Sequence, residues 1–154
     1  MLAGWQNLRP ADRTGSVFLR ICGGLAIACL DGMPIQSYRD LVVWQKAMSL
    51  AAEVYTVGRG LPHHDRSTLG NQLQRAAISI PSNIAEGWAR GHGRTYIFHL
   101  RIALGSEAEL QTQLELAERI GIVNPATTRA LIEDAAEVGR MLRALVAALN
   151  RRGE

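Results

Sequence analysis

The stretch PATTRALIEDAAEVGRMLRALVAALN, residues 125–150, carries the clearest structural signal in this chain of 154 residues. Its apolar side chains recur in alternating steps of four and three, the spacing of a heptad seam along one side of a helix. The members of this seam are Leu131, Ala135, Val138, Leu142, Leu145 and Leu149. Pro125 suits the first helical turn, where no backbone donor is required. The stretch therefore predicts a long amphipathic helix that packs against other helices.

Two segments upstream show the same helical spacing of apolar residues. One helix is expected from Asp40 to Val57, with Gly58 and Gly60 ending it. Another is expected from Arg94 to Ile120, with Gly121 at its end. The first of these carries two adjacent apolar stripes, a face wide enough to contact two neighbouring helices.

A further helix is expected between these two, and it contains a proline. It begins at Asp65 or Ser67, either of which can cap it, after a connection at residues 61–64. The sequence Gly91-His92-Gly93 ends it, since both glycines can adopt positive φ. Pro81 removes a backbone donor inside the helix, so we expect a kink just before it or a division into two shorter helices.

Together these segments predict an all-α protein, an antiparallel up-down-up-down four-helix bundle over residues 37–150 with a tail at 151–154. The centre of the third helix is unusual because polar residues occupy every side of it. At least some of them are expected to form hydrogen bonds to the second helix or to a neighbouring subunit. These residues are Ser106, Glu107, Gln111, Thr112 and Gln113.

Residues 1–36 form an irregular, glycine-rich extension without this pattern. Three interpretations stay open: translation that begins at Met33, a poorly ordered tail, and a targeting segment with residues 21–30 as its apolar core. A membrane span is excluded, because the apolar run is shorter than about 20 residues and Arg20 interrupts it. The cysteines of the chain, Cys22 and Cys29, both lie here, which fits a reducing, cytoplasmic setting for the bundle.

The stretch QLQRAAISIPSNIAEG, residues 72–87, resembles the four-helix bundle proteins encoded in 23S rRNA intervening sequences. The resemblance extends from about Tyr38 to Leu149 and omits the N-terminal extension, consistent with a start at Met33. Further matching pieces are LVVWQKA at 41–47, ALGS at 103–106, Glu109, TQL at 112–114 and Met141-Leu142.

The same family includes the accessory protein of diversity-generating retroelements, a homopentameric barrel with a basic surface that binds nucleic acid and a reverse transcriptase. The resemblance therefore implies a four-helix bundle, a homopentamer and nucleic-acid binding. This chain departs from that pattern in charge. Its net charge is only +3 and Lys46 is its single lysine, so it is less basic than a dedicated nucleic-acid binder.

Four arginines are the candidate nucleic-acid ligands, because they lie on the second helix, the turn after it and the third helix: Arg75, Arg90, Arg94 and Arg101. If their side chains converge, these arginines form a cationic patch that binds phosphate groups. The alternative is solvated surface arginine that pairs with Glu86 or Glu107. Aromatic residues are not expected to lie between these arginines, so stacking on single-stranded bases is not predicted.

A second candidate is the motif around the proline, formed by Pro81, Ser82, Asn83, Glu86 and Gly87. One interpretation is a binding surface of exposed backbone and small polar groups. The other is that these residues shape the second helix for packing against the third. Ser79, Ser82 and Asn83 can also bond the carbonyls that the proline leaves free.

No constellation predicts catalysis, a cofactor or a metal. His63, His64 and Asp65 lack further ligands at zinc spacing, and His92 and His99 are two helical turns apart. Glutamates 107, 109 and 115 lack the Glu-x-x-His motif of di-iron bundles. We expect a non-enzymatic, cytoplasmic, oligomeric adaptor that binds nucleic acid and assists a reverse transcriptase or an RNA-processing factor. The alternative is a protein–protein scaffold with no nucleic-acid role.

Overall fold

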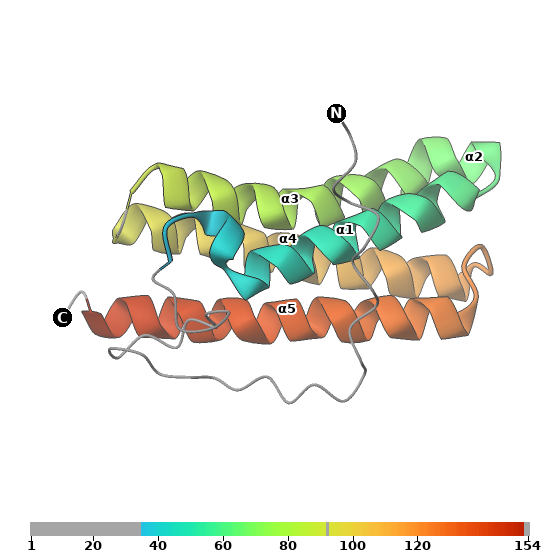
Figure 1. Ribbon diagram of the computed structural model, residues 1–154. Coiled ribbons are helices and arrows are strands. Elements are labelled where there is room, and N and C mark those ends of the chain that lie inside the picture. Colours follow the sequence, from blue (N-terminus) through green and yellow to red (C-terminus); the bar gives the residue numbers. More distant parts are fainter. Residues whose placement is uncertain (1–34, 92, 153–154) are drawn as a thin grey trace.

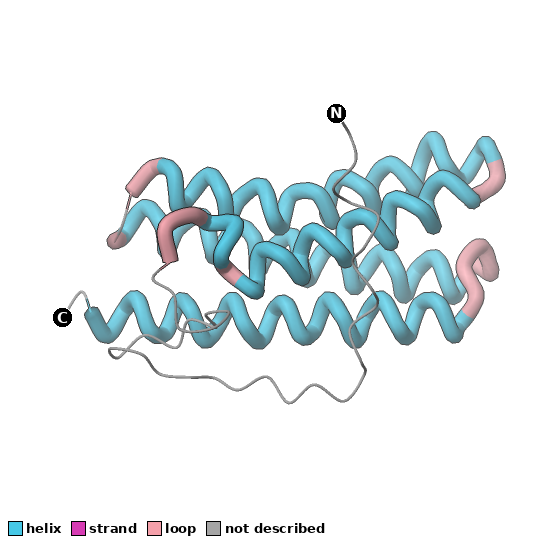
Figure 2. Tube along the Cα trace, viewed as in Figure 1, coloured by secondary structure: helices cyan, strands magenta, loops and turns pink. Residues whose placement is uncertain are grey.

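The computed structural model describes residues 35–91 and 93–152, and within them every regular element is helical (Figures 1 and 2). The long helices are α1 (Val42–Gly60), α3 (Asn71–Ala89), α4 (Arg94–Arg119) and α5 (Pro125–Arg152). Three short elements complete the chain: the 3₁₀ turn η1 (Tyr38–Asp40), α2 (His63–Asp65) and the π-helical turn η2 (Arg66–Gly70). The predicted all-α bundle is confirmed. The predictions for the extension, including a start at Met33, lie outside the described residues.

The four long helices lie side by side in one bundle (Figure 1). Both α1 and α4 pack against α3 and against α5, so α1 and α4 occupy diagonal corners. Short connections make each helix antiparallel to the next. This arrangement leaves each helix one outward face, and those faces hold the candidate sites.

The core between the helices is mostly aliphatic, in keeping with the low aromatic content, and also contains the buried side chain of Tyr96. The heptad seam of α5 supplies much of it. All of its members from Leu131 to Leu145 are buried, and Leu149, near the helix end, is partly buried. The same apolar spacing buries Leu73, Ile80 and Ile84 of α3.

The predicted end of the first helix was wrong. Gly58 and Gly60 both lie within α1, and the helix stops at Leu61, whose ψ is 153°. Pro62 is the physical reason, because a proline disfavours the helical conformation in the residue before it. Gly58 serves packing instead: a Cβ there would lie 2.6 Å from Nε2 of Gln74 on α3.

The predicted start of the second helix was also too late. Helical structure resumes at His63 directly after Pro62 and runs without a break through η2 into α3. Neither Asp65 nor Ser67 is a cap, because both already lie inside this helical run. Ser67 donates its hydroxyl proton back to the carbonyl of His64 at 2.8 Å.

The proline does not divide α3, which continues through Pro81 as one curved helix (Figure 1). Ser82 Oγ donates to the carbonyl of Ile78 at 2.8 Å, and Asn83 Nδ2 donates to that of Ser79 at 2.9 Å. These carbonyls follow that of Ala77, the one whose helical donor the proline removes. The side chains therefore reinforce the turn beside the missing bond.

The first helix begins at Val42 and not at the predicted Asp40, which lies in η1. The turns after α3 and α4 agree with the sequence prediction. Gly91 (φ 105°), Gly93 (φ 89°) and Gly121 (φ 77°) all adopt the left-handed conformation that favours glycine. At the start of α5, Oδ1 of Asn124 accepts a hydrogen bond from the backbone nitrogen of Thr127 at 2.9 Å. The helix then continues through Arg152, beyond the predicted end at Asn150.

Candidate functional site

A chain of polar side chains lies between α3 and α4. Ser79 Oγ is 2.8 Å from Ser106 Oγ, and Nδ2 of Asn83 donates to the Ser79 carbonyl. This donation fixes the amide orientation, so Oδ1 of Asn83 faces Nδ1 of His99 at 3.3 Å. An amide oxygen only accepts, and Nδ1 of His99 is therefore the protonated nitrogen. These contacts bind the centre of α3 to α4.

Gly87 lets the two helices approach closely one turn further on. A Cβ at this position would lie 2.7 Å from the Cβ of His99 and 2.9 Å from Cδ2 of Tyr96. Both atoms belong to side chains of α4 and lie near its backbone. These atoms therefore cannot move aside freely. Gly87 and Asn83 thus act in packing α3 against α4.

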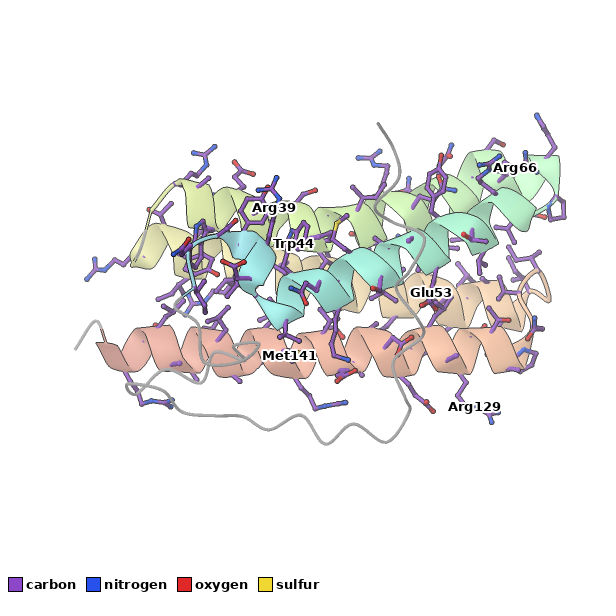
Figure 3. The ribbon with its side chains drawn as sticks, viewed as in Figure 1. Arg39, Trp44, Glu53, Arg66, Arg129 and Met141 are labelled. Atoms are coloured by element: carbon purple, nitrogen blue, oxygen red, sulfur yellow. The ribbon has the colours of Figure 1, made fainter. Side chains whose placement is uncertain are left out.

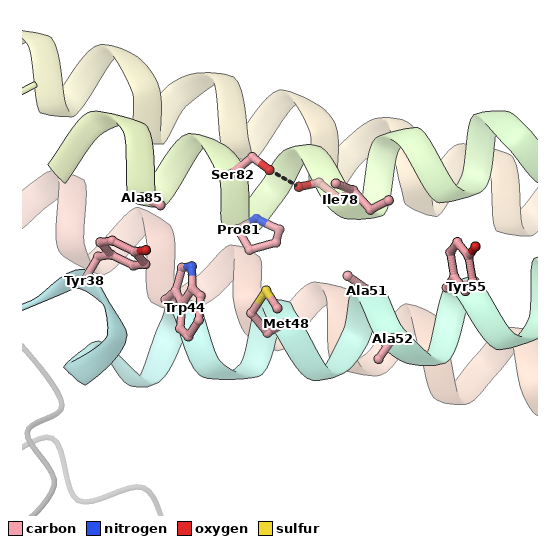
Figure 4. Close-up of a pocket in the computed structure, with 10 residues that line it drawn as sticks. All are labelled: Tyr38, Trp44, Met48, Ala51, Ala52, Tyr55, Ile78, Pro81, Ser82 and Ala85. Atoms are coloured by element: carbon pink, nitrogen blue, oxygen red, sulfur yellow. Dashed lines mark hydrogen bonds between the residues drawn. The ribbon is translucent and has the colours of Figure 1, made fainter. Parts of the chain in front are cut away.

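Two other residues of the same motif face α1. The pyrrolidine ring of Pro81 is buried, and Ser82 is exposed beside it. Both line an open groove of about 390 Å³ between α1 and α3 (Figure 4). The motif is therefore divided between a closed polar contact and an open apolar groove. The full lining is Tyr38, Trp44, Met48, Ala51, Ala52, Tyr55, Ile78, Pro81, Ser82 and Ala85.

Three of the candidate arginines lie toward the same end of the α3–α4 pair, and one lies apart. Arg90 and Arg94 flank the turn between α3 and α4, and Arg101 lies two helical turns along α4. Arg75 lies near the other end of α3, about 22 Å from Arg90 at 1.5 Å per residue. All four are exposed.

Arg90 is engaged by an acidic neighbour. Its Nη2 lies 2.6 Å from Oε1 of Glu86, one turn before it, and its Nε donates to the same oxygen at 2.8 Å. The interpretation of these arginines as paired surface residues thus holds for Arg90. Glu107, the other suggested acidic partner, instead lies 4.0 Å from Nη1 of Arg143 on α5.

The sequence interpretation overlooked an aromatic residue among these arginines. Phe98 is 60 % exposed on the outer face of α4. It lies one helical turn after Arg94 and one turn before Arg101, so the three side chains share that face. The signal was present in the sequence, because Phe98 stands off the apolar stripe of Ile97 and Leu100.

Glu107 faces α5. The sequence analysis expected at least some of the polar residues at the centre of this helix to bond the second helix or a neighbouring subunit. The side chain of Glu107 is 4 % exposed, and a Cβ on Gly139 would lie 2.8 Å from its Oε1. Burial raises the pKa of Glu107, while Arg143 and a hydrogen bond from Gln111 act in the opposite direction. Its neighbour Ser106 is hydrogen-bonded to Ser79 of α3, as predicted.

The other two glutamates of the carboxylate candidate do not converge with Glu107. Glu109 accepts a hydrogen bond from Gln113 at 2.9 Å, and Glu115 lies 4.0 Å from Arg119, both away from the buried Glu107. Over residues 35–91 and 93–152, no three side chains of histidine, cysteine, aspartate or glutamate cluster as a metal site would require. His92 is outside the described residues.

None of the described helices combines the length and the apolar character that a bilayer span needs.

Comparisons with known proteins agree with this fold. The chain is similar to a solved structure from Bacteroides thetaiotaomicron VPI-5482, a protein with unknown function from the S23 ribosomal protein family. The two share 24 % sequence identity with a TM-score of 0.64, over 69 % of this chain and 96 % of that chain. At this identity the likeness shows the fold alone. No curated protein matches this chain.

The sequence itself carries the family signal. The family model of the 23S rRNA-intervening sequence protein matches residues 39–144, which span nearly the whole bundle. This match confirms the resemblance predicted from residues 72–87. The chain therefore belongs to the 23S rRNA-intervening sequence protein family.

Proposed function

We propose that this protein is a non-enzymatic, oligomeric adaptor that binds single-stranded nucleic acid through the first half of α4. The observation that carries the proposal is the shared, exposed face of Arg94, Phe98 and Arg101. Guanidinium groups bind phosphate bidentately, and an exposed aromatic ring stacks on a base at about 1–3 kcal/mol per base. Aromatic and cationic side chains alternating along one helix suit a strand whose bases are unpaired.

The absence of enzymatic activity is part of the proposal, and the character of the groove supports it. Its lining is apolar apart from the hydroxyl groups of Tyr38, Tyr55 and Ser82 and the indole N–H of Trp44. The Ser82 hydroxyl is bonded to the carbonyl of Ile78 in its own helix. The buried ionisable side chains Tyr96, His99 and Glu107 lie between helices and away from this lining. A general acid or base within reach of a nucleophile is what an active site would require.

The proposal extends to assembly and partners. We expect a homo-oligomer. Its resemblance to the retroelement accessory protein implies a pentamer. A reverse transcriptase or an RNA-processing factor in the cytoplasm is the expected protein partner. Exposed apolar side chains on more than one face support association with other protein surfaces.

Fluorescence anisotropy with a labelled single-stranded RNA and its DNA equivalent tests nucleic-acid binding. Affinity should fall with salt, and Arg94→Gln should lower the slope of log K against log salt by about 0.7. Phe98→Ala should weaken binding about tenfold and leave that slope unchanged, because stacking releases no counterions. Arg75→Gln is the matched control, since Arg75 lies far from this face.

Two results would contradict the proposal. One is no binding at low salt, and the other is binding that Arg94→Gln, Arg101→Gln and Phe98→Ala all leave unchanged. A duplex of the same sequence distinguishes stacking from simple charge attraction, because its bases are not free to stack on Phe98. Equal loss of duplex binding in Phe98→Ala would remove the single-strand assignment.

The second candidate function is a protein–protein scaffold without a nucleic-acid role, and the apolar groove favours it. Affinity capture from nuclease-treated lysate of the source cells separates the two. Partners that persist after nuclease, combined with absent oligonucleotide binding, would support the scaffold.

A further inference from the structure

The groove between α1 and α3 is apolar but is bordered by positive charge. Tyr55 (46 % exposed) and Ile78 (47 % exposed) belong to its lining. Arg59 follows Tyr55 by one turn on α1, and Arg75 precedes Ile78 by one turn on α3, so both extend the lining face. At the other end, Arg39 lies over the Tyr38 ring, 4.6 Å from its centre (Figure 3).

Neither acidic residue of η1 and α1, Asp40 or Glu53, belongs to the groove lining. Asp40 accepts hydrogen bonds from the backbone nitrogens of Gln36 at 2.9 Å and Ser37 at 2.8 Å. Burial and the nearby Asp134 of α5 raise the pKa of Glu53, so that carboxyl group lies toward α5. The groove therefore suits an apolar occupant that carries carboxylates.

The second half of α4 has this character. Leu116 (48 % exposed) and Ile120 (54 % exposed) lie one turn apart on the outer face of the helix. The segment from Glu109 to Ile120 contains three glutamates and one arginine. The first half of the same helix, by contrast, exposes Arg94 and Arg101.

The groove and this acidic stripe cannot meet within one copy. The groove is formed by α1 and α3, whereas α4 lies at the corner diagonal to α1 with its stripe facing outward. Each copy thus presents one concave basic surface and one convex acidic surface. Two such surfaces on different faces favour a heterologous contact, in which every copy binds one neighbour through each.

We propose that the groove receives the Glu109–Ile120 segment of α4 from a second copy of this chain, an inference that rests on the self-association in the proposed function. Leu116 and Ile120 enter the apolar lining, where Met48 and Ile78 are exposed. Glu109 and Glu115 lie toward the bordering arginines. The first half of α4 stays outside this contact and keeps its nucleic-acid face free.

Two substitutions test this contact on the full chain. Ile78→Arg places a charge in the groove, and Leu116→Arg places one on the stripe, each at an exposed helical position. Light scattering after gel filtration should show the wild type above the chain mass of 16.8 kDa and each variant at that mass. Circular dichroism should show equal helical content, which separates lost assembly from lost folding.

Mixing the two variants gives the decisive measurement. The Ile78→Arg copy retains a stripe and the Leu116→Arg copy retains a groove, so an equimolar mixture should form a dimer of one copy each and stop there. Phe98→Arg is the matched control, because it changes a more exposed apolar residue on the same face outside the contact. It should keep the wild-type mass.

The outcomes separate this inference from the function on which it rests. If neither Ile78→Arg nor Leu116→Arg changes the mass of the oligomer, the inference is overturned and self-association still stands. If the mixture of the two variants stays monomeric, the inference is overturned in the same way. A monomeric wild type would overturn both. Each monomeric variant should still bind the RNA probe, because Arg94, Phe98 and Arg101 are intact in it.

Discussion

The two contacts of α3 with its neighbours differ in chemistry and in closeness. Toward α4, Ser79, Asn83 and Gly87 meet Ser106, His99 and Tyr96 through hydrogen bonds and close packing. Toward α1, the same stretch of α3 presents Ile78, Pro81 and Ser82 to an open, apolar groove. One continuous motif therefore supplies both a sealed interface and an accessible one.

The difference indicates which side of the motif maintains the fold and which side is available to a partner. Buried polar groups that pair across α3 and α4 specify one alignment of the two helices, since a slip along the axis would leave them unpaired. The groove has no such pairing to lose. Substitutions should therefore destabilise the protein on the α4 side and have little effect on stability on the α1 side.

The largest effect is expected at Gly87. In Gly87→Val the new Cβ would lie within 2.7 Å of His99 Cβ, so α3 and α4 must separate. Overpacking of this kind costs about 3 kcal/mol. Urea unfolding followed by circular dichroism measures it.

Gly105→Val is the matched control for Gly87, because a Cβ at Gly105 has no neighbour within 4 Å. It should be neutral or slightly stabilising, since glycine is a poor helix former. Equal losses in the two variants would show that the close approach at Gly87 is not what limits substitution there.

The next effect is expected at Asn83. Asn83→Ala removes the acceptor for Nδ1 of His99, which is 8 % exposed, and leaves that donor with only Oε2 of Glu86, 3.9 Å away, beyond hydrogen-bond distance. An unsatisfied buried donor costs about 2 kcal/mol. Urea denaturation of wild type and variant measures the difference, and a loss below about 0.5 kcal/mol would mean that the polar contact contributes little to stability.

A smaller effect is expected at the contact of α4 with α5, where Glu107 is buried. Its folded pKa is raised, so the folded state holds this proton more tightly than the unfolded state does. The stabilisation is present when Glu107 is protonated, at low pH, and is lost as the pH rises through the folded pKa.

Comparing wild type with Glu107→Gln between pH 7 and pH 5 isolates this group. The wild type should gain stability relative to the variant as the pH falls, because the folded state favours the protonated form of this buried carboxyl group. This measurement adds the contact between α4 and α5 to the two contacts of α3 compared above. A relative gain for the variant instead would mean that Arg143 outweighs burial at this site.

The bundle itself could be predicted because its signals are local and repeated. The seam of α5 and the stripes of α3 and α4 follow the helical period, and burying them requires only that helices meet side by side. The turn glycines Gly91 and Gly121 were also predictable, because each stands where an apolar stripe ends.

Some errors arose where a local signal was overlooked: Pro62 sets both the end of α1 and the start of the next helical run. Others arose where the outcome depends on contacts distant in the sequence. Gly58 reads as a helix stop until Gln74 is seen packed on it, and the partner of Glu107 became known only once Gly139 lay opposite. The sequence also did not predict that the motif around Pro81 contacts two helices, because Gly87 and Ser82 are close in the chain but face different helices. Phe98 is different: its exposure followed from helical spacing and was overlooked.

The smallest effect is expected on the groove side, at Ser82. Its hydroxyl donates to the Ile78 carbonyl in its own helix and is exposed, so Ser82→Ala removes a bond that water can replace. Stability should change by less than about 0.5 kcal/mol in urea denaturation, although Ser82 adjoins Asn83 in the chain. A loss as large as that of Asn83→Ala would mean that the turn after Pro81 depends on this hydroxyl. The groove side of α3 would then maintain the fold as much as the α4 side does.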